Sequence, residues 1–307
     1  MRSGATLELQ VRPPEAAVVL RRLESRNGQL LPGEVLAPDD EGSWELAPGR
    51  YAVEPVDGGW HYPIRVDRGD RQRLRLDLRG MDQVGPELCF VPGGLARLGG
   101  DVGAPGSGPA RDGQVASFAL ARHPVSIGAW ARFLQWIGQD DPALAASLRP
   151  PGFDPAATEA SRRPVTGITR DEARTYCQWM TQATGVTIRL PRADELEKAL
   201  RGADRRIFPW GDGFDAERCA SLWTCAPDGP PPTVGSYPAD RSPFGVEDGA
   251  GGVWEWTHDD VRDRAIVLGG AFTGDEAGAR SAARRALAPQ TRLGWLGFRV
   301  VQELRGL

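Results

Sequence analysis

Hydrophobic and polar residues alternate with a period of two in the first quarter of the chain, a pattern typical of half-buried strands. The alternation is clearest over residues 6–11 and 73–78, where every second residue is leucine or valine. Shorter apolar stretches lie between them, separated by turn-forming pairs of Asn, Pro and Gly. We therefore predict a small all-β sandwich over residues 1–79, with the role of an adaptor, and a linker over residues 80–86.

Three later segments have the spacing of amphipathic helices. Apolar residues of the segment 126–136 share one face, and Ser126 is placed to cap its N-terminus. Thr169 and Glu172 have the spacing of a capping box at the start of a second helix. Residues 192–201 predict a third, shorter helix that ends before a glycine.

Irregular structure is expected in much of the remaining chain. Residues 140–163 are rich in Pro, Ala and Asp, and after residue 203 only short strands near 265–268 and 298–301 are expected. The chain holds 39 Gly and 26 Pro, which favour turns, and 10 Trp, more than either Phe or Tyr. We therefore expect a loop-rich domain over residues 87–307 whose irregular segments are anchored by indoles.

Charge and composition exclude several classes of function. The net charge of the 307-residue chain is −4 with no basic run, so we expect no nucleic-acid partner. No secretory segment and no apolar run of about 18 residues is present, so we expect no membrane span and a cytoplasmic or unknown location. The four cysteines are too few for a disulfide framework.

Three motifs near the C-terminus carry a family resemblance. They are Gly-Gly-Val-Trp-Glu-Trp-Thr at 251–257, Leu-Gly-Gly-Ala-Phe at 268–272 and Leu-Gly-Phe-Arg-Val-Val at 296–301. Together with earlier blocks in the same order, they cover about residues 87–303 and resemble the formylglycine-generating enzyme (sulfatase-modifying factor) family. The resemblance implies an α+β domain of C-type lectin-like fold, here preceded by the β-sandwich. The phrase at 46–51 resembles the turn-into-strand motif of PEGA-type modules, which are often linked to kinases.

The same resemblance implies one structural calcium ion. Its ligands would be the carboxylates of Asp248 and Glu255 and the backbone carbonyls of Gly251 and Val253, a hard-oxygen set that suits Ca²⁺. The alternative is that Glu255 only caps a loop by hydrogen bonding. At a second calcium position of the family, this chain offers Ser221, a poorer ligand, so we predict no metal there.

The reactive groups of the family's oxidases are missing from this chain. Those oxidases bind copper through a pair of cysteines just after the second motif, where residues 273–281 contain no sulfur. Cys219 and Cys225 lie in a different loop, and the three histidines do not match the iron-binding pattern of a related branch. We therefore assign no catalytic residue, expect no copper, and leave open whether the protein is an enzyme, leaning against it.

A non-catalytic ligand- or protein-binding scaffold is the favoured prediction. Trp and Arg dominate binding hot spots, so Arg292 and Trp295 are the expected anchors, although Trp295 could instead pack inward. The predicted surface consists of Thr273, Asp275, Glu276, Gln290, Thr291, Arg292 and Trp295. Such a pseudoenzyme resembles the variable proteins of diversity-generating retroelements, or a sensor module linked to a signalling kinase. The alternative function is a divergent metal-dependent oxidoreductase.

Overall fold

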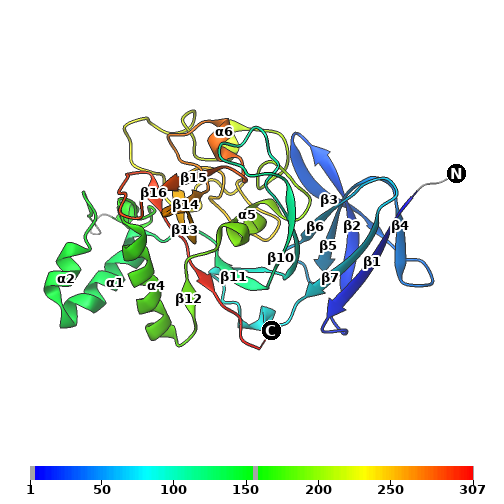
Figure 1. Ribbon diagram of the computed structural model, residues 1–307, viewed down its shortest axis with the longest axis horizontal. Coiled ribbons are helices and arrows are strands. Elements are labelled where there is room, and N and C mark those ends of the chain that lie inside the picture. Colours follow the sequence, from blue (N-terminus) through cyan, green and yellow to red (C-terminus); the bar gives the residue numbers. More distant parts are fainter. Residues whose placement is uncertain (1–3, 155–157, 307) are drawn as a thin grey trace.

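The computed structural model describes residues 4–154 and 158–306 (Figure 1). Its first part contains two sheets, with strand orders β4-β1-β7 and β3-β2-β5-β6. The apolar side chains of the alternating segments enter one core, as predicted, and Leu7 is fully buried. The strands are β1 (Ala5–Arg12), β2 (Val18–Arg26), β3 (Gln29–Leu36), β4 (Ser43–Leu46), β5 (Gly49–Pro55), β6 (Tyr62–Val66) and β7 (Arg71–Asp77).

The remaining residues form three further sheets, and α-helices and long loops surround them. Their strand orders are β12-β17-β11-β8, β15-β14-β13-β16 and β10-β9. The strands are β8 (Leu88–Val91), β9 (Gly94–Leu98), β10 (Arg111–Val115), β11 (Phe118–Ala121), β12 (Ile188–Arg189), β13 (Trp254–Val261), β14 (Arg264–Leu268), β15 (Arg284–Leu287), β16 (Leu296–Gly297) and β17 (Val301–Gln302). The helices are α1 (Ile127–Asp140), α2 (Pro142–Ser147), α3 (Thr158–Ser161), α4 (Arg170–Thr184), α5 (Ala193–Arg201) and α6 (Glu276–Ala279), with short 3₁₀ turns at Met81–Gln83 and Ala216–Arg218. This mixture of sheets and few helices agrees with the predicted α+β class.

The helix starts predicted from the sequence are confirmed. The Ser126 hydroxyl accepts a hydrogen bond from the backbone N–H of Ala129 at 3.2 Å, which caps α1. Thr169 and Glu172 form the capping box of α4, with reciprocal hydrogen bonds of 3.2 and 2.8 Å. Helix α5 ends at Gly202, whose φ of 70° is one that a glycine adopts without strain.

Two segments are more regular than predicted. The Trp-Glu-Trp motif lies in strand β13, which pairs with both β14 and β16, although the sequence indicated a loop there. The segment 140–163 contains the short helices α2 and α3, and its residues 155–157 lie outside the described residues. Glycine-rich flanks weaken the local strand signal around β13, so cross-strand pairing rather than local propensity determines this strand.

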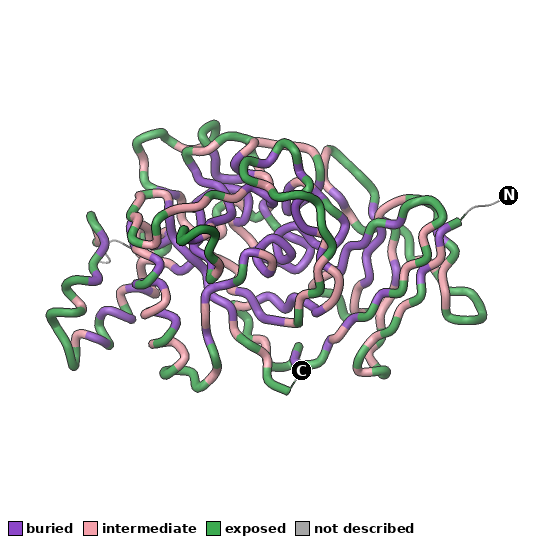
Figure 2. Tube along the Cα trace, viewed as in Figure 1, coloured by how far each residue is buried: buried purple, intermediate pink, exposed green. Residues whose placement is uncertain are grey.

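The first two sheets and the rest of the chain share one continuous core (Figure 2). Side chains of β5, β6 and β7 pack with Phe90 of β8 and with Leu196 and Leu200 of α5. We call the contact between the first two sheets and the rest of the chain the seam. Lys198, the chain's one lysine, is fully buried there, and its Nζ donates to the Pro92 carbonyl at 2.6 Å. The division into domains at residue 79 stays a prediction, because the packing is continuous across it. Within the described residues, no helix combines the length and apolar character needed to cross a membrane.

Candidate ligand-binding surface and buried ionic centre

A buried ion pair lies at the centre of the C-terminal sheets. Glu255 of β13 accepts two hydrogen bonds from Arg299, at 2.6 Å from Nε and 2.7 Å from Nη2, and both side chains are fully buried. Trp254 and Trp256, on either side of Glu255, are buried as well. A charge-assisted, two-point contact of this kind fixes both position and orientation. We call Glu255 and Arg299 the ionic centre.

Arg299 also connects the ionic centre to neighbouring loops. Its Nη1 donates to the carbonyls of Ala121 and Arg122 at 3.2 and 3.0 Å, and its Nη2 to those of Glu247 and Asp248 at 3.1 Å each. Burial is the largest single influence and acts to lower the pKa of Arg299, but the combined attraction of Glu255, Asp248 and Asp240 raises the pKa. Burial also raises the pKa of Glu255, with Arg299 opposing that shift.

The residues predicted to bind calcium surround this centre. Asp248 is half-buried at a φ of 55°, and its Oδ2 accepts from the backbone N–H of Gly235 at 2.7 Å. Gly251 and Val253 are buried on the chain that leads into β13. A cavity of about 10 Å³, lined in part by Asp240, Asp248 and Val253, has room for one water molecule or one ion.

The donor chemistry of this region fits a hard cation in part. The carboxyl groups of buried Asp240 and Glu255 and of half-buried Asp248 lie in the field of one guanidinium, and desolvation raises the pKa of each, that of Asp240 to about 8. One Asp240 oxygen, Oδ1, is buried without a hydrogen-bond partner among the described residues. However, no three acidic, histidine or cysteine side chains of residues 4–154 and 158–306 converge as a metal site. A cation here would need backbone carbonyls, and it would have to share Glu255 with Arg299.

The loop at residues 273–281, which contains no cysteine and which we call the cysteine-free loop, supplies the first half of the predicted ligand surface. Thr273, Asp275 and Glu276 are exposed. The Asp275 carboxylate caps α6 by accepting from the backbone N–H of Gly278 at 3.0 Å. The Oε1 atom of Glu276 lies 3.5 Å from Nη1 of Arg280, four residues further along the chain. Because these side chains are exposed to solvent, a ligand can reach them.

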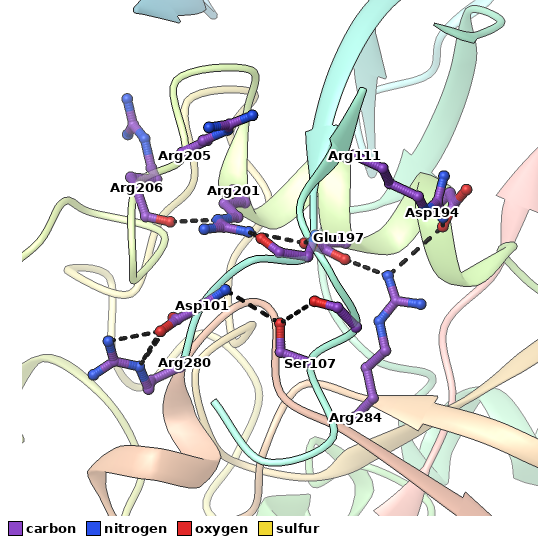
Figure 3. Close-up of polar contacts among 12 residues, drawn as sticks. Asp101, Ser107, Arg111, Asp194, Glu197, Arg201, Arg205, Arg206, Arg280 and Arg284 are labelled. Carbon is purple, nitrogen blue, oxygen red and sulfur yellow. Dashed lines mark hydrogen bonds and ion pairs between the residues drawn. The ribbon is translucent and has the colours of Figure 1, made fainter. Parts of the chain in front are cut away.

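A network of arginines and carboxylates connects this loop to the loop after β9, and α5 to β15 (Figure 3). Arg280 donates to Asp101 through three contacts of 2.9–3.1 Å, which tie α6 to the loop after β9. Arg284 of β15 contacts Glu197 of α5, which also accepts from Arg201 at 3.0 Å. Glu197 is fully buried, so Arg284 and Arg201 neutralise a negative charge that water does not reach.

The second half of the predicted surface follows β15. Gln290 is exposed and Thr291 is half-buried. Arg292 is anchored on helix α4, because it donates to the Gly167 carbonyl at 2.9 Å and to Glu172 at 2.5 Å. Trp295 is half-buried, so its ring is neither fully exposed, as expected of a ligand anchor, nor fully packed inward, the alternative that the sequence left open. Arg292 therefore has partners within the protein, which limits its freedom as a ligand anchor.

Arg285 joins the two halves, and the sequence analysis missed it. Its guanidinium lies over the ring of Trp254 at 4.7 Å and over that of Trp295 at 5.5 Å, while Arg285 itself is exposed. Trp254 in turn borders α6, since a side chain at Gly278 would come within 4.0 Å of its ring. An arginine two residues after Ala-Ala carries no sequence signal for this stacking, which depends on the strand pairing.

The cysteines lie apart from this surface. Cys177 and Cys219 are buried, and burial raises the pKa of both thiols, that of Cys177 to about 12. Cys225 is half-buried, 3.7 Å from the Tyr237 hydroxyl. Burial thus disfavours the thiolate form of Cys177 and Cys219.

A family model, the sulfatase-modifying factor enzyme 1-like domain, matches residues 78–304. Hercynine oxygenase of Mycolicibacterium smegmatis is 32% identical over 213 residues, which are 60% of this chain and 48% of that protein. The inactive C-alpha-formylglycine-generating enzyme 2 of Bos taurus is 26% identical over 69% of this chain and 86% of its own length. A serine/threonine-protein kinase, pkn1 of Chlamydia caviae, is 29% identical over 56% of this chain and 28% of its own length. The chain thus spans about half the length of the oxygenase.

Two solved structures share the fold. PvdO from Pseudomonas aeruginosa superposes with a TM-score of 0.60 at 24% identity and covers 71% of this chain and 95% of its own. Treponema denticola variable protein 1 gives a TM-score of 0.57 at 16% identity, with coverages of 70% and 94%. At these identities the likeness concerns the fold, which agrees with the predicted C-type lectin-like, formylglycine-generating-enzyme-like domain.

Proposed function

The chain belongs to the sulfatase-modifying factor enzyme 1-like family, and we propose that within it this protein is a non-catalytic binding scaffold. The observation that carries the proposal is the position of Arg285, which is exposed yet held over two indoles beside the cysteine-free loop. A pre-positioned cation and aromatic surface offers a ligand both charge and apolar area at little entropic cost. We call Arg285 together with Thr273, Asp275, Glu276, Gln290, Thr291, Arg292 and Trp295 the loop surface.

Two relatives support this proposal. The bovine relative is named an inactive formylglycine-generating enzyme, and the Treponema protein of the same fold is named a variable protein. The kinase relative favours a role as a recognition module attached to a signalling protein. The ligand we propose is a protein or peptide, because the loop surface mixes acid, base, amide and indole groups as interfaces do.

Peptide selection tests the scaffold directly. A phage-displayed peptide library is panned against the wild-type protein, and the recovered peptides are then measured on Arg285→Ala and Trp295→Ala. We expect both substitutions to weaken binding at least about tenfold, the size of a hot-spot loss. The matched control is Arg65→Ala, an exposed arginine of the first sheets that is paired with Asp67. Peptides that bind all four proteins equally would show that the loop surface is not the binding site.

The alternative, a divergent metal-dependent oxidoreductase, is kept because an oxygenase is among the relatives. Metal analysis of the purified protein and oxygen consumption with a cysteine-containing peptide separate the two functions. The scaffold predicts no stoichiometric copper or iron and no oxygen uptake above the buffer. One equivalent of copper with oxidation of the peptide would overturn the scaffold and establish the enzyme.

We further propose that calcium stiffens the scaffold at Asp248, Glu255 and the carbonyls of Gly251 and Val253. The carboxyl groups of Asp240, Asp248 and Glu255 outnumber the one guanidinium beside them, and this surplus of negative charge supports a cation. After removal of metal with EDTA, added Ca²⁺ should raise the melting temperature more than Mg²⁺ does, because only the native state binds it. Asp248→Asn should abolish the increase, whereas Asp228→Asn, in an exposed loop, should keep it. An equal response of both variants would exclude this site.

A further inference from the structure

A cleft of about 540 Å³ lies on the seam between the first sheets and the rest of the chain. It is lined by β6 and β7 on one side and by β9 and β10 on the other, with Ala203 after α5. Figure 1 shows β7 and β10 next to each other at this seam. The volume is in the range of small-molecule sites in proteins. It lies outside the loop surface and the ionic centre.

The floor of the cleft is apolar and its walls are polar. Ile64, Leu74 and Ala203 are buried residues of the floor, and Leu95 beside them is half-buried. The walls are formed by the side chains Gln72, Arg73, Arg75, Arg97, Asp112 and Gln114. The polar lining holds three guanidinium groups, two amides and the one carboxylate of Asp112, so it carries an excess of positive charge beside the apolar floor. This combination matches a ligand with an apolar body and a negatively charged end.

Two of the three wall arginines have no carboxylate partner among the residues that the structure describes. Arg73 is paired with Glu8 at 2.7 Å, but the Nε of Arg75 donates only to the amide oxygen of Gln10, at 3.2 Å. Arg97 forms no ion pair with any described residue, and its Nε is buried without a hydrogen-bond partner among residues 4–154 and 158–306. Arg97 is half-buried, whereas the buried arginines of the described residues all have a carboxylate partner. These are Arg170, Arg201, Arg206 and Arg299.

The carboxylates near the cleft do not neutralise Arg97. Asp112, opposite Arg97 in the β9–β10 pairing, is paired with Arg205 at 3.4 Å. Asp70 accepts hydrogen bonds from the Asp67 backbone and from Gln72, which lower its pKa, and the field of Arg97 adds to this only weakly. Acidic residues outnumber basic ones 41 to 37 in the chain. An arginine that lacks a carboxylate in such a protein is available for a negatively charged ligand.

We propose that this seam cleft binds a small organic anion, whose carboxylate or phosphate group contacts Arg97 and Arg75 and whose apolar body lies on Ile64, Leu74 and Leu95. A guanidinium offers planar, two-point hydrogen bonding to either anion. Because the cleft walls come from both sides of the seam, the bound anion joins the first sheets to the C-terminal part. It is a second binding site that is independent of the loop surface.

The probe for this test is 2-naphthoate, with the neutral isostere 2-naphthamide as its matched ligand control. Calorimetry at low salt should give saturable binding of 2-naphthoate, about tenfold or more tighter than that of the amide. Arg97→Gln should weaken 2-naphthoate binding at least about tenfold, and Arg75→Gln less. Arg65→Gln, outside the cleft, should bind it like the wild type. Affinity should fall as salt is added, since charge attraction is screened.

Two outcomes would overturn the proposal: equal affinity for the naphthoate and the amide, or unchanged naphthoate binding in Arg97→Gln. Arg97→Lys is the control that distinguishes loss of charge from loss of folding. It keeps the positive charge and should retain part of the affinity for 2-naphthoate. The melting temperature of each variant is measured in parallel. If Arg97→Lys and Arg97→Gln lose binding equally while both melt like the wild type, charge at residue 97 is not what holds the anion.

Discussion

One sheet of this protein holds two arginines in opposite ways. Arg299, next to β16, is fully buried and gives both guanidinium edges to carboxylate and carbonyl oxygens. Arg285 of β15 is exposed and rests on two indole rings without a carboxylate partner. The adjacent residue Arg284 points to the other face of the strand and contacts buried Glu197. Arg299 is thus held by carboxylate and carbonyl oxygens, whereas exposed Arg285 has no ion pair among the described residues and can face a ligand.

This difference separates what maintains the fold from what is free to change. The ionic centre joins four loop carbonyls and a strand carboxylate, so a substitution there alters many contacts at once. Side chains of the loop surface have few internal contacts, and several have none beyond a local cap. A scaffold of this kind can accept new surface residues without losing its fold. The predictions below test that contrast.

The largest effect is expected from Arg299→Met. The substitution leaves Glu255 buried without its partner and removes four hydrogen bonds to carbonyls, so the free energy of unfolding should fall by about 3–5 kcal/mol. Urea denaturation measures the loss. The double variant Glu255→Met with Arg299→Met should recover part of it, because the unpaired charge is gone. A loss below about 1 kcal/mol in the single variant would show that the ionic centre is not what holds these loops.

Lys198 sharpens the comparison, because it is a buried cation without a carboxylate partner within hydrogen-bonding distance. Its Nζ donates to carbonyls of Pro92 and Gly94 and lies 5.4 Å from the Tyr62 ring, and burial lowers its pKa to about 7. The folded state therefore binds fewer protons than the unfolded state between pH 7 and 10.5, the ordinary pKa of a lysine. In that window the lysine's contribution to stability rises with pH, and below pH 7 it is constant and at its lowest.

Lys198→Met should remove this pH dependence. The difference in unfolding free energy between wild type and variant should move by about 2 kcal/mol in favour of the wild type from pH 6 to pH 9. Guanidinium denaturation at each pH gives the two curves. Parallel curves would mean that the lysine keeps its proton in the folded state. Arg299→Met, by contrast, should lose more stability relative to the wild type as the pH rises, because Glu255 and Asp240 would then ionise in the folded state without the guanidinium that lowers their pKa values.

The sequence predicted those features that depend on local chemistry. The Ser126 cap, the Thr169–Glu172 box and the alternating strands all follow from neighbouring residues, and the structure confirms them. The motifs around Trp254 indicated the family and the fold, because they are short runs of neighbouring residues that can be compared without knowing the structure. What local patterns do not encode is which distant groups meet.

Long-range pairing accounts for what the sequence missed. Glu255 was predicted as a calcium ligand, and its contact with Arg299, 44 residues away, is visible only once β13 and β16 are paired. Arg285 was not predicted at all, because its stacking on Trp254 and Trp295 follows from the order of strands in the sheet. Arg292 was predicted as an anchor, and the structure gives it partners on α4. The predicted calcium and ligand assignments stay predictions.

A smaller effect is expected from the stacking of Arg285 on Trp295. A double-mutant cycle with Arg285→Ala and Trp295→Ala should give a coupling energy of about 0.5–1 kcal/mol, the usual size for an exposed cation–π contact. Thermal unfolding of the four proteins measures it. Arg285→Lys serves as a control that keeps the charge but loses the planar stacking. A coupling of zero would indicate that the two side chains are placed independently, and the loop surface would then lack a fixed centre.

The smallest effect is expected where the surface should tolerate change. Thr273→Ala and Gln290→Ala replace exposed side chains and should alter the unfolding free energy by less than about 0.5 kcal/mol. Gly270→Ala, only three residues before Thr273, is the contrasting variant. Gly270 has a φ of 80°, and an added Cβ would lie 2.7 Å from the Gly278 carbonyl, so this substitution should cost more than about 1 kcal/mol. Urea denaturation of the three variants compares them. Equal losses would mean that the loop surface is as constrained as the buried backbone that supports it, which argues against a surface open to variation.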